Sequence, residues 1–193
     1  MKKTLDEMSL EELWELFPII LKEHNPQYKH WYEVEAQAIR EKIAGDDIAR
    51  MNHIGSTAVE GLLAKPTVDI LLEIDGCCNV TQLISDLESI GWGLMNRKND
   101  PVSLAFCKGY TPDGLAEKVY HLHVRYLGDW NELYFRDYLI AHPGAAAEYA
   151  DLKRALWKEY EHDRDGYTDA KSDFIIKHSR AAKREFHNQY KPG

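Results

Sequence analysis

The chain has few positive charges relative to its negative ones. It carries 24 Lys and Arg against 32 Asp and Glu, which gives a formal net charge of −8. Because binding to a phosphate backbone or an anionic membrane surface depends on clustered Lys and Arg, we expect neither generic nucleic-acid binding nor membrane binding. An acidic average can still contain a small basic pocket, so a nucleotide or another phosphorylated small molecule stays open as a ligand.

The sequence also lacks long apolar runs and cysteines at metal-binding spacing. No apolar stretch approaches the roughly 20 residues that cross a bilayer, and Glu11 and Glu12 stand where a signal peptide needs an apolar block. The three cysteines show no CxxC spacing, which predicts reduced thiols. We therefore expect a cytoplasmic protein. Sequence does not indicate its oligomeric state.

The 193 residues suffice for one domain with a hydrophobic core. We expect a single domain over 1–193, with N-terminal helices in 1–46, a sheet core in 47–127 and C-terminal helices in 128–193. Apolar periodicity and turn residues predict helices over 9–16, 27–43, 81–90, 129–141, 143–163 and 169–190, and strands over 48–54, 67–74, 102–108 and 118–126. This order predicts an α+β fold, with a mixed sheet and a helical C-terminal half beside it.

A turn of small residues, Gly55-Ser56-Thr57, follows the first predicted strand. Such a turn exposes backbone N–H groups and hydroxyls, which can hold an anion such as phosphate. Ser56 or Thr57 can equally serve only to cap a short helix. Lys65 precedes Pro66 at the entrance of the next strand, where its ammonium could reach a phosphate, pair with Asp69 or remain a solvated surface charge.

Asp69 interrupts the most apolar strand, residues 67–74. Alternation places Val68, Ile70, Leu72 and Ile74 on a buried face, and Asp69 with Glu73 on the other. These two carboxylates lie about 13 Å apart along the strand, too far to share the paired ions of a two-metal site. Asp69 is either a site residue or a structural partner of nearby N–H groups.

His121 and His123 share one face of the last predicted strand with Arg125. Their Cα atoms are about 6.6–6.8 Å apart, so both imidazoles can reach one metal ion. With Asp69 they would form a two-His, one-carboxylate site. The alternative is that the imidazoles bind polar groups on a half-buried sheet face. His53 and Arg125 are expected to line the same cleft.

The motifs together resemble the GrpB family, a branch of the nucleotidyltransferase-like fold. The resemblance rests on His53-Ile-Gly-Ser-Thr-Ala-Val59, Gly61-Leu62, Lys65-Pro66 and Asp69, then on residues 120–124 and 136–143. It implies a nucleotidyltransferase-like mixed sheet with flanking helices, with Gly55 and Ser56 on the phosphates of a nucleotide. Active relatives of this fold carry a second carboxylate two residues after the first. Here that position is Leu71, which weakens a two-metal mechanism.

The C-terminal helices add two Tyr–Lys pairs, Tyr149 with Lys153 and Tyr167 with Lys171. Residues four apart lie on one helix face. The resemblance implies that these faces close the cleft, so that the lysines meet phosphates and the tyrosines line the site. Arg136 is expected to line the cleft as well, although an ion pair with the adjacent Asp137 is the simpler interpretation.

Three functions remain open on sequence. The first is nucleotidyl transfer to an unknown acceptor, with Asp69 holding Mg²⁺ or another divalent metal on a nucleoside triphosphate. The second is a nucleotide-binding module without catalysis. The third is a metal-dependent hydrolase that uses Asp69, His121 and His123. In the first reading Asp69 is the catalytic residue.

Overall fold

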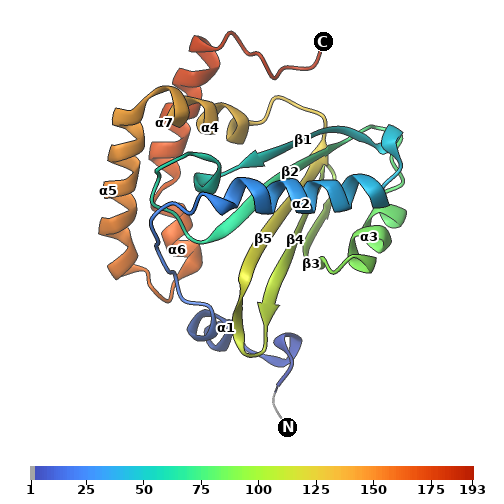
Figure 1. The fold of residues 1–193 in the computed structure, drawn as a ribbon, viewed down its shortest axis with the longest axis horizontal. Helices are drawn as coiled ribbons and strands as arrows, with labels where there is room; N and C mark the ends of the chain where they lie inside the picture. The colour runs from blue at the N-terminus through green and yellow to red at the C-terminus, as the bar shows by residue number, and fades with distance from the viewer. Residues whose placement is uncertain (1–2) are drawn as a thin grey trace.

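A five-stranded sheet forms the centre of the molecule. The computed structural model describes residues 3–193. The strands are β1 (Ile48–Ile54), β2 (Thr67–Ile74), β3 (Gly93–Asn99), β4 (Val102–Thr111) and β5 (Gly114–Tyr126), in the spatial order β1-β2-β5-β4-β3. The pair β2 and β5 runs parallel, whereas the other neighbours are antiparallel. The mixed sheet of an α+β fold is thus confirmed (Figure 1).

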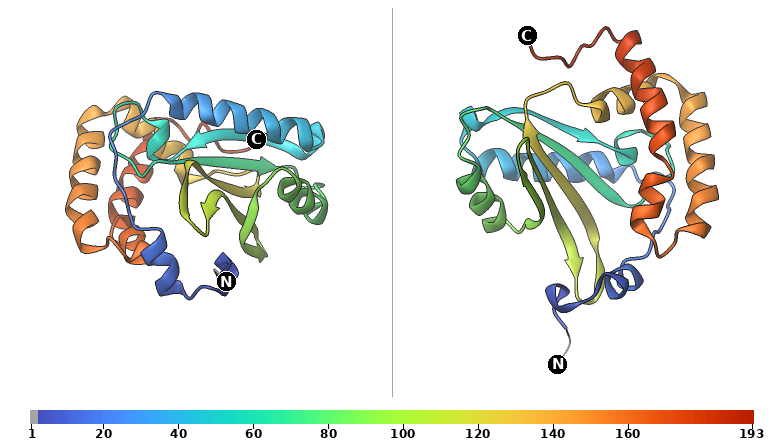
Figure 2. Two further views of the ribbon diagram at one scale, coloured as in Figure 1. Left: turned by 60° about the horizontal axis from the view of Figure 1, so that its bottom comes forward. Right: turned by 180° about the vertical axis from the view of Figure 1, so that it is seen from behind.

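Residues 3–193 contain seven α-helices, which lie around the sheet. They are α1 (Leu10–Leu16), α2 (Gln27–Lys42), α3 (Val80–Ser89), α4 (Asn131–Ala141), α5 (Pro143–Glu159), α6 (Arg164–Asp169) and α7 (Ser172–Glu185). Helices α5, α6 and α7 stand beside the end of the sheet where β1 stops and β2 starts (Figure 1). Helices α1 and α2 lie on opposite sides of the sheet (Figure 2). No helix within residues 3–193 combines the length and apolarity needed to span a bilayer.

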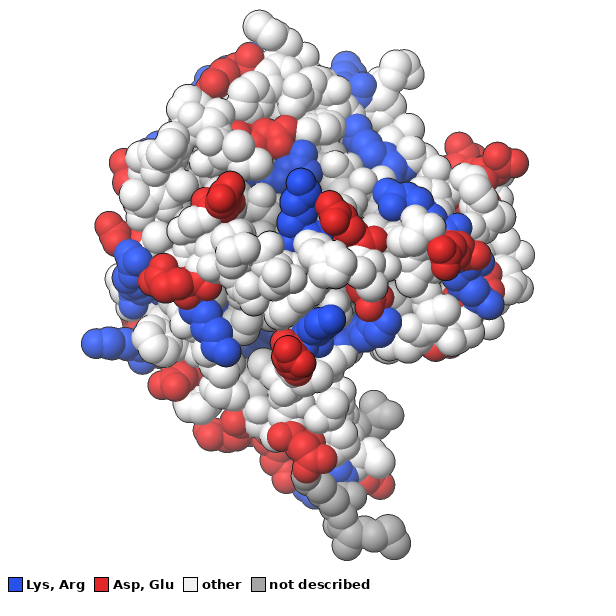
Figure 3. Space-filling model, viewed as in Figure 1, with Lys and Arg blue, Asp and Glu red and all other residues white. Residues whose placement is uncertain are grey.

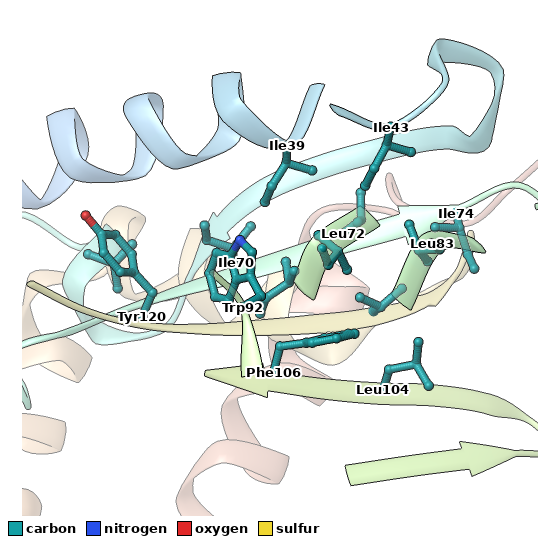
Figure 4. Close-up of a cluster of buried hydrophobic side chains, with 14 of the residues drawn as sticks. Ile39, Ile43, Ile70, Leu72, Ile74, Leu83, Trp92, Leu104, Phe106 and Tyr120 are labelled. Carbon is teal, nitrogen blue, oxygen red and sulfur yellow. The ribbon is translucent and has the colours of Figure 1, made fainter. Parts of the chain in front are cut away.

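The main core lies between the sheet and helices α2 and α3. Figure 4 shows Ile70, Leu72 and Ile74 of β2 facing Ile39 and Ile43 of α2. With Val68 these strand residues are fully buried, as the period-two alternation predicts. Burying each such side chain contributes about 1.5–3 kcal/mol, so this layer fixes β2 in the centre of the sheet.

The opposite face of β2 is also covered, which alternation alone does not reveal. Leu71 packs against Ile54 of β1 and Leu133 of α4. Glu73 is fully buried and accepts hydrogen bonds from Arg50 Nε (2.5 Å) and Nη2 (2.7 Å). Glu73 is therefore a structural partner of Arg50, and Asp69 alone of the two carboxylates on this face is left to serve a site.

Several element boundaries differ from the sequence prediction. Strand β3 has no exposed–buried alternation, since all its residues are exposed, and it was not predicted. The loop expected between residues 108 and 118 is mostly paired strand, because Gly109 (φ +91°) forms a bulge after which Tyr110 pairs with Leu115.

The last predicted helix is wrong at both ends. It starts earlier, at Arg164, because the Asp163 side chain caps the N–H of Gly166 at 2.8 Å, and it is interrupted between α6 and α7. It stops at Glu185 rather than at residue 190, since His187 and Asn188 adopt left-handed conformations. The start predicted at residue 129 is also shifted, to Asn131.

The surface agrees with the mixed composition. On the face seen in Figure 3, Lys and Arg side chains alternate with Asp and Glu, and no broad patch of one sign forms. All three cysteines are free thiols.

Candidate phosphate-binding cavity

A small polar cavity opens where β1 ends and β2 begins, next to helices α5 to α7. Its volume is about 190 Å³. The sheet end and the three helices contribute its lining, which consists of Gly55, Ser56, Thr57, Lys65, Thr67, Asp69, His121, Tyr149, Lys153, Tyr167 and Lys171. The structure thus brings together most of the residues that the sequence suggested for one site.

The turn that closes β1 is built on Gly55. This residue has φ +72°, a conformation that favours glycine, and a Cβ atom there would lie 2.5 Å from Asp69 Oδ2. The 3₁₀ turn Ser56–Ala58 begins directly after it. The first N–H groups of such a turn have no partner inside it, and Ser56 and Thr57, which carry them, line the cavity together with Asp69.

Three lysine side chains line the same cavity. Lys153 and Lys171 are only 3% and 8% exposed, and Lys65 is half-buried. None of the ion pairs between residues 3 and 193 involves any of the three. Three amino groups therefore face one carboxylate, Asp69, so their protonation gives the cavity an excess of positive charge.

Burial lowers the pKa of each of these lysines. It lowers the pKa of Lys153 from its usual 10.5 to about 7, with a smaller effect of Arg154. Burial, then the positive charges of Lys65 and Lys153, lowers the pKa of Lys171 to about 7. Burial and Arg164 lower the pKa of Lys65 to about 8, although Asp69 opposes this. Protonating these buried lysines therefore costs free energy, and a bound anion would offset that cost.

Ser56 and the two tyrosines complete the wall. Lys153 Nζ donates to Ser56 Oγ at 3.1 Å and to the carbonyl oxygen of Leu63. Lys171 Nζ lies 3.8 Å from the ring centroid of Tyr167. The Tyr167 hydroxyl is buried and has no hydrogen-bond partner within the described chain. Since buried hydroxyls are nearly always paired, Tyr167 is a donor that a ligand could use.

Asp69 belongs to a chain of hydrogen bonds from the sheet to α6. Arg164 Nη2 donates to Tyr110 Oη at 2.9 Å, and Tyr110 Oη lies 2.8 Å from His121 Nε2. The other ring nitrogen of His121, Nδ1, lies 3.4 Å from Asp69 Oδ1.

His123 Nε2 lies 3.7 Å from the same Asp69 oxygen. Burial would raise the pKa of Asp69, but His121 and His123 outweigh it and hold the pKa well below its usual range. Asp69 is consequently an anion at neutral pH, with Oδ1 engaged by the imidazoles and Oδ2 toward Gly55.

The three predicted metal ligands are neighbours, but they do not surround a common point. Across residues 3–193, no three His, Cys, Asp or Glu side chains are grouped as one metal ion requires. Leu71 occupies the place of a second carboxylate and is held in an apolar cluster with Leu133. The present arrangement supports Asp69 as a single carboxylate and His121 as its hydrogen-bond partner.

Three residues expected in the cleft lie elsewhere. His53 points to the other face of β1, where it stacks on Tyr32 with ring centroids 5.0 Å apart, because it pairs with Ile70 and not with Asp69. His53 Nε2 lies 3.0 Å from Thr57 Oγ1, which itself donates to the Thr67 carbonyl. His53 therefore supports the turn from behind, and burial lowers the pKa of His53 to about 4.

Arg136 pairs with Asp137 (Nε–Oδ1, 2.8 Å), as the simpler interpretation holds, and also donates to the His53 carbonyl. With His53 it lines a separate depression between α2 and α4. Arg125 binds Glu132 at 2.7 Å and lies over the Trp130 ring, so neither arginine lines the cavity.

Sequence reasoning missed Arg164 and Tyr110. Arg164 falls in the turn between the helices predicted over 143–163 and 169–190, and Tyr110 falls in the loop predicted between two strands, so neither was given a role. Continued alternation beyond Lys108 would have been the available signal for Tyr110. Tyr167 lies in α6 and Lys171 in the turn just before α7, so they do not share one helix as predicted, yet their side chains still meet.

Comparison with known proteins identifies the chain. The family model described as GrpB protein matches residues 18–181. The chain belongs to the GrpB family. Every residue of the cavity lies inside the matched range.

Two sequence relatives and one solved structure show what the chain is similar to. A UPF0157 protein of Pseudomonas aeruginosa is 35% identical over 79% of the chain and 63% of its own length, so the chain spans less than two thirds of that relative. The glutamate-rich protein GrpB of Alkalihalophilus pseudofirmus is 34% identical over 81% of the chain and 91% of its own length. The crystal structure of conserved protein GrpB from Enterococcus faecalis superposes with a TM-score of 0.73 at 28% identity, covering 86% of this chain and 99% of that one.

Proposed function

We propose that this GrpB protein binds the phosphate groups of a nucleotide in the cavity between the sheet end and helices α5 to α7. The observation that carries the proposal is that Lys65, Lys153 and Lys171, which have no ion-pair partner within residues 3–193, line one cavity together with the turn after Gly55. Ammonium groups and exposed turn N–H groups are the donors that bind phosphate oxygens in proteins.

Nucleotidyl transfer extends this proposal. Mg²⁺ bound by Asp69 together with phosphate oxygens would fit a site with one anionic carboxylate and would supply charge neutralisation at the transferred phosphoryl group. The chain's own part is to hold the phosphates with its lysines and to keep Asp69 ionised through His121 and His123. The packing of Leu71 argues for one ion and against a pair.

A thermal-shift panel tests the proposal. Purified protein is heated with ATP, GTP or inorganic tripolyphosphate, each with and without Mg²⁺. Ligand at about 100 times its dissociation constant adds about 2.7 kcal/mol, which should raise the melting temperature by roughly 5 °C or more. The same panel on Lys153→Met and Ser56→Ala should show a strongly reduced shift.

Lys158→Met is the matched control, since Lys158 is exposed on the same helix as Lys153. It should respond like wild type. If none of the three ligands shifts the melting temperature, the phosphate site is refuted. If Mg²⁺ adds to the rise in melting temperature and Asp69→Asn abolishes this addition, the metal role of Asp69 is supported. If a nucleotide raises the melting temperature but no transferred product forms, a binding module is favoured.

A further inference from the structure

The phosphate cavity continues into a larger groove on the α1 side of the sheet. The groove has a volume of about 890 Å³ and shares Lys65, Asp69 and His121 with the cavity. Sites for small organic ligands usually measure about 300–1,000 Å³. The cavity of about 190 Å³ is below this range and the groove is within it, so phosphates fit the first while the rest of a nucleotide needs the second.

Two apolar walls face each other across the groove. Helix α1 contributes one wall, and its apolar residues follow helical spacing: Leu10, Leu13, Trp14 and, at its end, Phe17. No residue of Leu10–Leu16 is buried, whereas Phe17 at its end is only 4% exposed, so most of the apolar stripe stays open toward the groove. Leu94 and Met95 of β3 form the other wall, and the Met95 side chain is 59% exposed. Apolar surface left open beside a polar cavity is typical of a ligand groove.

The floor of the groove is aromatic and its rim is polar. Phe17 meets Tyr110 edge to face with centroids 4.8 Å apart, and Tyr110 stacks on His121. Arg164, Asp165 and Thr168 of α6 stand along the same groove. A flat aromatic group with hydrogen-bonding edges suits these surroundings, because its faces contact apolar side chains while its edge meets donors and acceptors.

We infer that the nucleoside part of the ligand binds in this groove, with its base between α1 and β3, an inference that rests on the proposed phosphate site. Leu10 to Phe17 lie before the matched family range, which begins at residue 18. The phosphate site thus falls in the family segment, whereas the α1 wall is added by the chain outside it. This wall selects the organic part of the ligand.

Isothermal titration calorimetry with four nucleoside triphosphates and inorganic tripolyphosphate tests the inference on the full chain. At least one nucleoside triphosphate should bind roughly tenfold or more tightly than tripolyphosphate, as base stacking on aromatic side chains provides. Met95→Asp should remove this difference while leaving tripolyphosphate affinity within about twofold. Trp14→Ala is the second groove variant. Val34→Asp, an exposed apolar position on α2, is the matched control and should keep the difference.

The outcomes separate the two proposals. If tripolyphosphate binds and needs Lys153, but every nucleoside triphosphate binds equally well, the groove inference is overturned and the phosphate site stands. If nothing binds, the phosphate site itself fails. If the difference survives in both groove variants, the base lies elsewhere. If Met95→Asp changes only the oligomeric state seen by light scattering, the groove is a contact between copies.

Discussion

Replacing Lys153 by Met should stabilise the ligand-free protein while it destroys phosphate binding. Lys153 is 3% exposed, and burial lowers its pKa to about 7. Releasing its proton on folding at pH 7 costs about 4 kcal/mol. Met has a similar shape without the amine, but it leaves the Leu63 carbonyl without its donor, which costs about 1–3 kcal/mol. The net expectation is a gain of about 2 kcal/mol in the free energy of unfolding at pH 7.

The lowered pKa of Lys153 also predicts in which direction the stability of the protein changes with pH. Between pH 7 and 9 the unfolded chain keeps the proton on Lys153, whereas the folded protein loses it. Because the unfolded state then binds more protons, stability rises with pH, by about 2 kcal/mol per lysine across this window. The same holds for Lys171, whose pKa is also about 7. Stability is lost as the pH falls toward the folded pKa of these two lysines. Lys153→Met should therefore remove about half of the slope that Lys153 and Lys171 together give to the free energy of unfolding against pH.

Urea unfolding at pH 7, 8 and 9 measures both effects, in a buffer without phosphate or other multivalent anions. Lys158→Met, on the exposed side of the same helix, should change stability by less than about 0.5 kcal/mol and keep the slope. If Lys153→Met instead lowers stability and leaves the pH slope unchanged, Lys153 is not an unpaired buried amine and the reasoning fails.

Three further substitutions test separate parts of the structure. Tyr167→Phe should leave urea stability within about 0.5 kcal/mol, since its hydroxyl has no described partner, but should weaken tripolyphosphate binding several-fold in calorimetry. Leu71→Ala should cost about 2–5 kcal/mol in urea unfolding because Leu71 is fully buried against Ile54 and Leu133; a smaller loss would contradict that packing. Glu73→Ala should cost about 3–5 kcal/mol because it removes the buried carboxylate that accepts from Arg50 and from the Gly128 N–H, and unchanged stability would contradict these bonds.

Sequence predicted the parts of the fold that depend on local pattern. Strands β1 and β2 have the predicted bounds, because turn residues flank both of them and the apolar residues of β2 alternate. Strand β3 has exposed side chains throughout, so no alternation marks it. The helix ends near residues 164 and 185 depend on a side-chain cap and on left-handed residues, which composition does not reveal.

Sequence predicted most residues that line the candidate site, but it did not predict the contacts that these residues make. Gly55, Lys153 and Asp69 were recognised through motif resemblance, and the structure brings them to one cavity. His53 was misplaced because the register of β1 on β2 decides which face a residue occupies. Arg164 is linked to the site by its hydrogen bond to Tyr110, which lies 54 residues away in the sequence, and no local spacing encodes such a contact.

Proton uptake on phosphate binding tests the central claim most directly. At pH 8 Lys153 and Lys171 are mostly neutral in the free protein, and a bound phosphate should restore their charge. Calorimetric titration of tripolyphosphate in buffers of different ionisation enthalpy should show uptake of more than about one proton per site, reduced in Lys153→Met. Absence of binding, or binding without proton uptake that Lys153→Met leaves unchanged, would contradict a phosphate site built on these lysines.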